Sequence, residues 1–151
     1  MASRFRFSRT VFGLAIALTA CGGSNGASSL APIECLFNGQ SQLIYPIPNA
    51  TNVPTTLQQV VFATSRLFPS SFNVLINNDP NPNIGAHSFS AFFQGIQPSQ
   101  VPQPSATPAM SNAFYESATI GGSLPRGTYY VFLNDNLGGC TPTSAGSFTT
   151  Q

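Results

Sequence analysis

The stretch LPRGTYYVFLND, residues 124–135, decides the fold that this sequence predicts. Proline and glycine interrupt regular structure at its start, and the β-branched and aromatic residues that follow favour an extended strand. We expect a strand over residues 128–134. Because residues 129–133 are apolar at every position, this strand is expected to lie centrally in a sheet covered on both sides, or to expose one face for contact.

Six further runs of β-branched and aromatic residues follow the same pattern, and most are ended by proline, glycine or asparagine. They cover residues 42–47, 58–65, 71–78, 87–94, 112–120 and 145–150, and a short edge strand is also expected around residues 35–37. No sustained helical period follows residue 30. About seven short strands in a chain of this length predict an all-β sandwich.

Three stretches resemble bacterial immunoglobulin-like domains, and they occur in the order found in that family. YPIPNATNVPTTLQQVVFATS (45–65) is similar to the opening of these domains, LPRGTYYVFLND to the entry into the penultimate strand, which fibronectin type III modules share, and GSFTT (146–150) to the closing strand. The resemblance implies an immunoglobulin-like β-sandwich over residues 32–151. It also places Tyr130 at the tyrosine corner, where a tyrosine hydroxyl bonds to upstream backbone. Pro125 stands one place earlier than in the family motif.

The first 20 residues have the layout of a bacterial export signal. A basic start, MASRFRFSR, precedes an apolar run over residues 11–18 that is too short to span a membrane. The sequence LTAC, ending at Cys21, resembles the lipobox of bacterial lipoproteins. That resemblance implies an acylated N-terminal Cys21, and two or more acyl chains anchor a protein stably. The alternative is a secreted protein with a chance cysteine near its cleavage site.

Residues 21–31 are rich in glycine and serine, so we expect a flexible tether between the lipid and the domain. Gly22 follows the lipobox cysteine, where lipoproteins kept at the inner membrane often carry aspartate. If the organism has two membranes, this favours the outer one.

Two cysteines remain once Cys21 is assigned to lipid, and we expect Cys35 and Cys140 to form a disulfide. Disulfides persist outside the cytosol, and this one would join the two ends of the domain. Metal ligation is the alternative. It lacks partners, because zinc sites use paired cysteines or histidines and His87 is the chain's one histidine. We therefore expect no metal and interpret His87 as a polar strand residue.

Charge is scarce, at 6% of residues. Beyond residue 20, two arginines stand against four carboxylates and no lysine occurs, so the basic cluster that nucleic-acid binding needs is missing. The sequence also offers no arrangement for acid–base or nucleophilic catalysis. We expect neither an enzyme, nor a cofactor, nor a nucleic-acid partner.

Three further segments have alternative interpretations. DPNPN (79–83) begins like a calcium loop, but Ile84 and Ser90 replace the required glycine and glutamate, which favours an Asx turn. The proline-rich residues 98–108 cannot form a central strand; they are predicted to cross between the two sheets, with partner recognition as the alternative. Phe89, Phe92 and Phe93 are predicted to be core residues, with a sugar-stacking platform as the alternative.

These observations together predict a non-catalytic protein of the bacterial cell envelope, held to a membrane through lipid on Cys21. Its immunoglobulin-like domain would have a structural or protein-interaction role. The alternative is a glycan-binding module that uses exposed aromatic residues, with Phe92 and Tyr129 as candidates.

Overall fold

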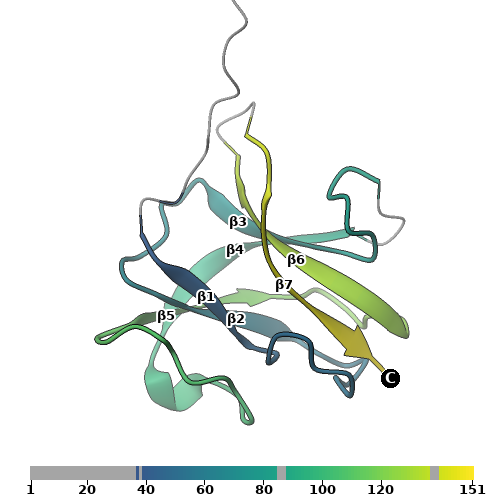
Figure 1. Cartoon of the computed structure of the whole chain (residues 1–151), viewed down its shortest axis with the longest axis horizontal. Helices are drawn as coiled ribbons and strands as arrows, with labels where there is room; N and C mark the ends of the chain where they lie inside the picture. The colour runs from purple at the N-terminus through teal and green to yellow at the C-terminus, as the bar shows by residue number, and fades with distance from the viewer. Residues whose placement is uncertain (1–36, 38, 85–87, 137–139) are drawn as a thin grey trace, which may run out of the picture.

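The computed structural model describes residues 37, 39–84, 88–136 and 140–151, and Figure 1 shows an all-β architecture. The seven strands are β1 (Ser41–Tyr45), β2 (Gln59–Thr64), β3 (Phe72–Asn77), β4 (Ser88–Ile96), β5 (Phe114–Thr119), β6 (Gly127–Asp135) and β7 (Thr143–Thr150), with one 3₁₀ turn, η1 (Pro98–Gln100), among the described residues. All seven predicted strands are confirmed, and their ends differ from the prediction by at most two residues. Of the short edge strand expected around residues 35–37, Phe37 alone is described, and it is not in a strand.

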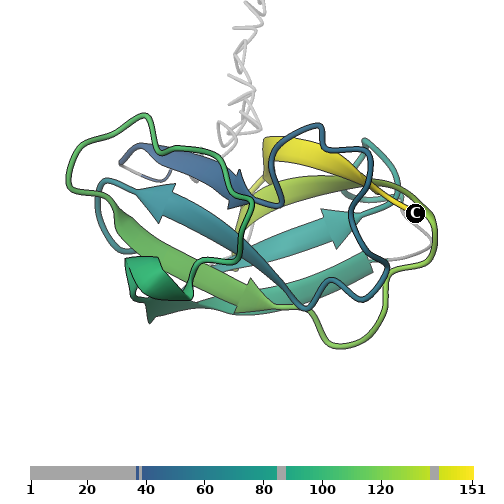
Figure 2. The ribbon, with the colours of Figure 1, turned by 90° about the horizontal axis from the view of Figure 1, so that it is seen from below.

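The strands form an antiparallel sheet in the order β1-β2-β5-β4-β3-β6-β7. It folds into two layers, a four-stranded sheet β1-β2-β5-β4 and a three-stranded sheet β3-β6-β7 (Figure 2). Strand β4 belongs to both: its first half pairs with β3, and its second half, from Phe93 to Ile96, pairs with β5. Four strands facing three in this order is the arrangement of immunoglobulin constant-type domains. The predicted immunoglobulin-like sandwich is confirmed.

The core lies between the two layers and is rich in aromatic rings. The ring of Phe68, from the connection between β2 and β3, stacks on Phe93 with a centroid separation of 4.3 Å and meets Phe62 edge-on at 5.9 Å. At the other end of the core, Tyr129 stacks on Phe148 at 5.8 Å. These offset and edge-to-face contacts add to the stabilisation from apolar burial.

The proline-rich segment covers the outer face of the four-stranded sheet. Residues 97–113 connect β4 to β5, which are neighbours in that sheet, so the predicted crossing between sheets is wrong. Val101, 7% exposed, packs in a second apolar cluster with Ile44, Val61 and Ala63. This cover explains why β2 is apolar on both faces.

Both edge strands of the sheet, β1 and β7, form further backbone contacts with other segments. The Ala106 N–H donates a hydrogen bond of 2.9 Å to the Ile44 carbonyl on β1. After β1 the chain runs beside β7, where Asn49 N–H donates to the Ser147 carbonyl and Val53 forms a parallel bridge with Thr150. Figures 1 and 2 show β1 and β7 side by side. These contacts use backbone groups that an added strand would need.

The tyrosine corner is made by Tyr129 and not by Tyr130 as predicted. The hydroxyl of Tyr129 donates a hydrogen bond of 3.0 Å to the carbonyl of Pro125, and its ring is 1% exposed. Side chains alternate along a strand, so Tyr129 and Val131 face the core while Tyr130 faces away.

Candidate binding groove

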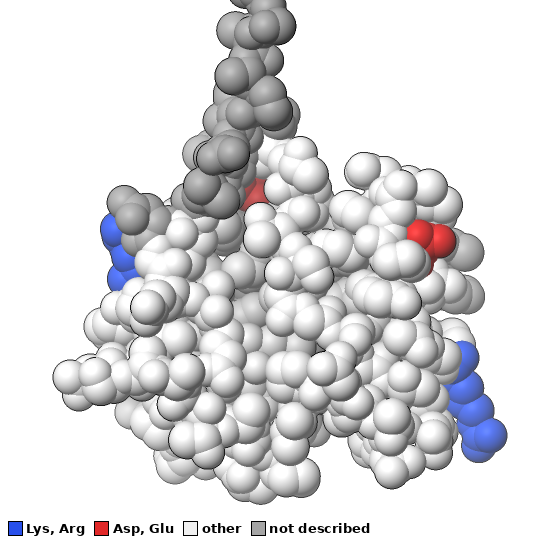
Figure 3. All heavy atoms as spheres, in the orientation of Figure 1, with Lys and Arg blue, Asp and Glu red and all other residues white. Residues whose placement is uncertain are grey.

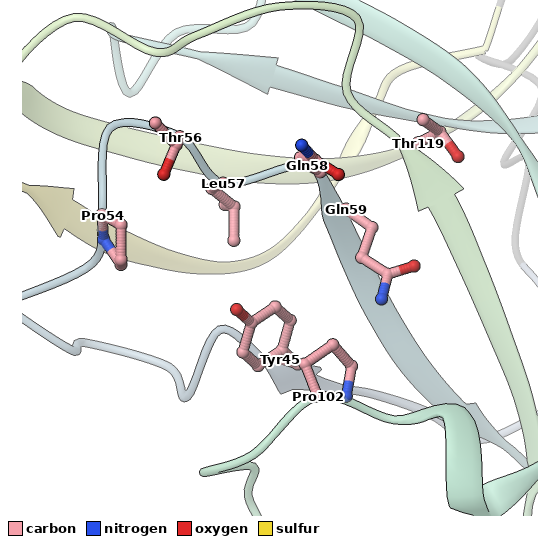
Figure 4. A pocket seen from close by; sticks show the side chains of 8 residues that line it. All are labelled: Tyr45, Pro54, Thr56, Leu57, Gln58, Gln59, Pro102 and Thr119. Atoms are coloured by element: carbon pink, nitrogen blue, oxygen red, sulfur yellow. The ribbon is translucent and has the colours of Figure 1, made fainter.

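A groove of about 430 Å³ opens at one end of the four-stranded sheet, beside Tyr45 (Figure 4). Tyr45 ends β1, Gln59 begins β2 and Thr119 ends β5, and the last two are direct partners in the β2–β5 ladder. The connection from β1 to β2 and Pro102 of the covering segment complete the walls. Its volume falls in the range of ~300–1,000 Å³ typical of small-molecule sites.

The polar lining of the groove consists of neutral hydroxyl and amide groups. They belong to Thr56, Gln58, Gln59 and Thr119. Neither glutamine side chain is hydrogen-bonded to another described residue. Each carboxamide offers two N–H donors and a carbonyl acceptor, so the groove presents free donors and acceptors without charge.

The apolar part of the lining surrounds the ring of Tyr45. Pro102 and the buried side chain of Leu57 lie on different sides of this half-buried ring, and the Gln59 amide extends toward it (Figure 4). A second hollow of about 290 Å³ shares Tyr45 and Pro54 with the first and adds Asn52 and Gln103. The tyrosine therefore stands between two adjoining neutral hollows. Such a lining suits a ligand with an apolar face and uncharged polar edges.

No match to this chain is found among protein-family models, curated proteins or solved structures. No helix in the described part of the chain is long and apolar enough to cross a membrane.

The predicted lipidation and disulfide sites fall mostly outside the described residues. Cys21, Cys35 and His87 all lie outside them. Cys140 is described, is partly buried and precedes β7. The acylation of Cys21 and the pairing of Cys35 with Cys140 stay predictions.

The DPNPN segment forms consecutive Asx turns, as predicted. The N–H of Asn81 donates to Asp79 Oδ1 at 2.8 Å, and the N–H of Asn83 donates to Asn81 Oδ1 at 3.0 Å. These bonds engage the side-chain oxygens that a calcium loop would turn toward its ion. Among the described residues, no three His, Cys, Asp or Glu side chains gather.

The aromatic candidates divide between core and surface. Phe89 and Phe93 pack against the core, as predicted, whereas Phe92 is 61% exposed and the core prediction for it is wrong. Tyr129, the other candidate named for the glycan-binding alternative, is 1% exposed. Tyr129 is therefore not available as an exposed sugar-stacking residue beside Phe92.

Glu116 is a buried carboxyl that the sequence reasoning missed. It is 4% exposed on the core-facing side of β5, and its Oε1 accepts a hydrogen bond of 2.7 Å from the N–H of Phe68. Burial raises the pKa of this carboxyl, and the hydrogen bond from the Phe68 N–H offsets part of the increase. Its position two residues from Ala118, on the same face of the strand, could have indicated an inward-facing side chain.

The surface around these features carries little charge. The described residues include Arg66, Arg126 and three carboxylates, and the face in Figure 3 shows a few scattered charged side chains among neutral residues. The groove residues gave no motif in the sequence, because Tyr45, Gln59, Pro102 and Thr119 are uncharged and come from separate segments. The fold alone brings them together.

Proposed function

We propose that this protein is a lipid-anchored module of the bacterial cell envelope that acts by binding a partner and not by catalysis. The anchor is a triacylated or diacylated Cys21, and residues 21–31 tether the domain to it. Two or more acyl chains hold a protein at a bilayer without a transmembrane helix. The apolar run over residues 11–18 and the lipobox-like LTAC support this location. Gly22 favours the outer membrane in an organism with two membranes.

The neutral groove beside Tyr45 is the observation that carries the binding role. Its free amide and hydroxyl groups, two of them on Gln59 and Thr119 that pair across β2 and β5, are suited to recognition. The few charged side chains around it give little long-range steering, so binding is short-range and only weakly dependent on salt.

A disulfide between Cys35 and Cys140 belongs to the same proposal, since disulfides persist in the envelope and not in the cytosol. The described neighbours support the pairing. The ring of Phe37 lies 6.0 Å from that of Phe72, and Phe72 pairs with Asp135 at the end of β6. Residue 37 is thus close to the end of the sandwich from which the chain continues toward Cys140.

The anchor is tested by intact mass of the protein from the membrane fraction of an exporting bacterium. The mature wild-type chain is expected to begin at Cys21 and to carry the mass of two or three acyl chains. The Cys21→Ser variant is expected to lack that mass and to leave the membrane fraction. A wild-type N-terminus without acyl mass would remove the lipoprotein assignment.

The binding role is tested with the Cys21→Ser chain secreted behind an ordinary export signal, which removes the lipid contribution. This lipid-free protein is expected to co-sediment with washed cell envelopes. Gln59→Ala is expected to weaken co-sedimentation, while Gln94→Ala, an exposed glutamine of β4 outside the groove, leaves it unchanged. Absence of co-sedimentation, or equal loss in both variants, contradicts a binding role for the groove.

A further inference from the structure

We infer that the groove beside Tyr45 binds a neutral oligosaccharide. This inference rests on the proposed function, because it names the class of partner for the same groove in an envelope protein. The first hollow combines an aromatic ring with unpaired amides and hydroxyls, and the lining of neither adjoining hollow includes a charged residue.

The chemistry of the lining matches that of a sugar ring. A pyranose has an apolar C–H face and an edge of hydroxyls that each donate and accept a hydrogen bond. The Tyr45 ring provides an apolar surface for the C–H face, and its own hydroxyl adds a polar group. The carboxamides of Gln58 and Gln59 can each donate to one sugar oxygen and accept from another hydroxyl.

The neutrality of the groove selects against charged ligands. The side chains lining the two hollows include no Arg, Asp or Glu. A uronate or phosphorylated sugar would lose hydration on entering without gaining an opposite charge, and this loss is costly. An uncharged sugar exchanges hydrogen bonds with water for hydrogen bonds with amides, at little net cost.

The extent of the groove points to more than one sugar unit. The hollows of about 430 and 290 Å³ adjoin at Tyr45 and Pro54, and the second contributes the amides of Asn52 and Gln103. Gln103 is already bonded to Ser105, whose N–H and hydroxyl hold its amide in place. A chain of sugars lying across Tyr45 would place one ring in each hollow.

A proline-rich peptide fits the groove less well. Such peptides dock between several aromatic side chains, and Tyr45 is the one aromatic residue that lines either hollow. The four neutral polar side chains of the first hollow would also face an almost donor-free ligand. The peptide is therefore an outcome that the test must separate.

The experiment is an NMR titration of the ¹⁵N-labelled, full mature Cys21→Ser chain. The neutral probes are cellotetraose, maltotetraose and chitotetraose, and the comparison ligands are tetragalacturonate and a proline-rich decapeptide. At about 10 mM probe, a site with a Kd of about 1 mM is mostly filled. At least one neutral probe is expected to shift the side-chain amide signals of Gln58 and Gln59 and the backbone signal of Thr119.

Three variants locate the binding energy. Gln59→Ala is expected to weaken the responding sugar about tenfold by removing paired hydrogen bonds. Tyr45→Leu is expected to weaken it by a similar factor, while Tyr45→Phe keeps the ring and most of the affinity. Gln94→Ala is the matched control and is expected to bind as the wild type does. Because Gln59 reaches the surface, its variant keeps the test valid if Tyr45→Leu fails to fold.

The inference is overturned if no neutral probe shifts the groove signals, or if the galacturonate or peptide binds there more tightly. Equal weakening by Gln59→Ala and Gln94→Ala also overturns it. These failures are distinct from failure of the proposed function. If the protein co-sediments with envelopes through the groove but binds none of the three sugars, the proposed binding function stands and the saccharide inference is wrong.

Discussion

The carboxylate of Glu116 accepts a hydrogen bond of 2.7 Å from the backbone N–H of Phe68, inside a protein that carries very little charge. Glu116 sits on β5 opposite Phe62 of β2, and the ring of Phe68 packs on Phe62 and Phe93. The bond thus fixes the β2–β3 connection to the four-stranded sheet. It satisfies a backbone donor that would otherwise be buried without a partner.

Substituting Glu116 separates the hydrogen bond from the charge. Glu116→Ala leaves the Phe68 N–H without an acceptor and is expected to lower the free energy of unfolding by about 1–3 kcal/mol. Glu116→Gln keeps an acceptor oxygen and is expected to lose less at neutral pH. Urea denaturation of the three proteins checks the order. Equal losses in the two variants would show that the acceptor has no structural role.

The pH dependence of stability reports the burial of the same carboxyl. Its pKa is raised in the folded state from the ordinary value of 4.5, so the folded protein binds the proton more tightly than the unfolded chain does. The contribution of the Glu116 carboxyl to the free energy of unfolding is fully present below pH 4.5 and is lost as the pH rises through the folded-state pKa. The wild type is therefore expected to gain stability relative to Glu116→Gln as the pH falls from neutral toward 4.5. Parallel curves of unfolding free energy against pH for the wild type and Glu116→Gln would contradict a raised pKa of the buried Glu116 carboxyl.

The tyrosine corner gives a matched pair of substitutions. Tyr129→Phe removes the hydroxyl that bonds to Pro125 and is expected to cost about 0.5–1.5 kcal/mol. The cost stays in this range because the Thr150 hydroxyl also donates to the same carbonyl, at 2.6 Å. Tyr130→Phe, one residue along the strand, is expected to change stability by less than about 0.5 kcal/mol. A larger loss of stability from Tyr130→Phe than from Tyr129→Phe would show that Tyr130 forms the tyrosine corner, as the sequence predicts.

The strands could be predicted because local composition and breakers set them independently of the rest of the fold. Runs such as residues 58–65 have high β-propensity and end at residues that cannot continue a strand. The corner was misplaced because Tyr129 and Tyr130 have the same side chain. Which of them faces inward depends on the phase of the strand against its neighbours, and composition does not give that phase.

The groove and the cover over the outer sheet face could not be predicted, because both arise from contacts between distant segments. Gln59 and Thr119 become neighbours through the β2–β5 ladder, and Pro102 reaches them from the covering segment. The prolines of residues 98–108 did allow the prediction that this segment is not a central strand. It packs on Val61 and Ala63 because β2 is apolar on both faces. The sequence shows this apolar pattern, but it does not show which segment covers the outer face.

The covering segment is expected to come away from the sheet without global unfolding. Val101→Asp places a charge in the apolar cluster with Ile44 and Val61, where burial of an unpaired charge is costly. Hydrogen exchange is expected to show lost protection of the Ala106 amide, while the amides of β3 and β6 stay protected. Ala109→Asp adds the same charge to an exposed position of the same segment and is expected to leave exchange unchanged. Global loss of protection in Val101→Asp would instead make the segment part of the cooperative core.

The predicted disulfide has a large expected effect, because it closes most of the domain into one loop. Non-reducing peptide mapping is expected to recover a linked pair of peptides containing Cys35 and Cys140. On the chain-entropy model, a loop of about 100 residues contributes about 4–5 kcal/mol. The double variant Cys35→Ser, Cys140→Ser is therefore expected to unfold at markedly lower urea concentration, and Cys21→Ser is the control with the bond intact. Alkylation of both thiols in the unreduced, exported protein would disprove the pairing. The sandwich would then depend on the ring contacts of Phe37 with Phe68 and Phe72 to hold its first described residues in place.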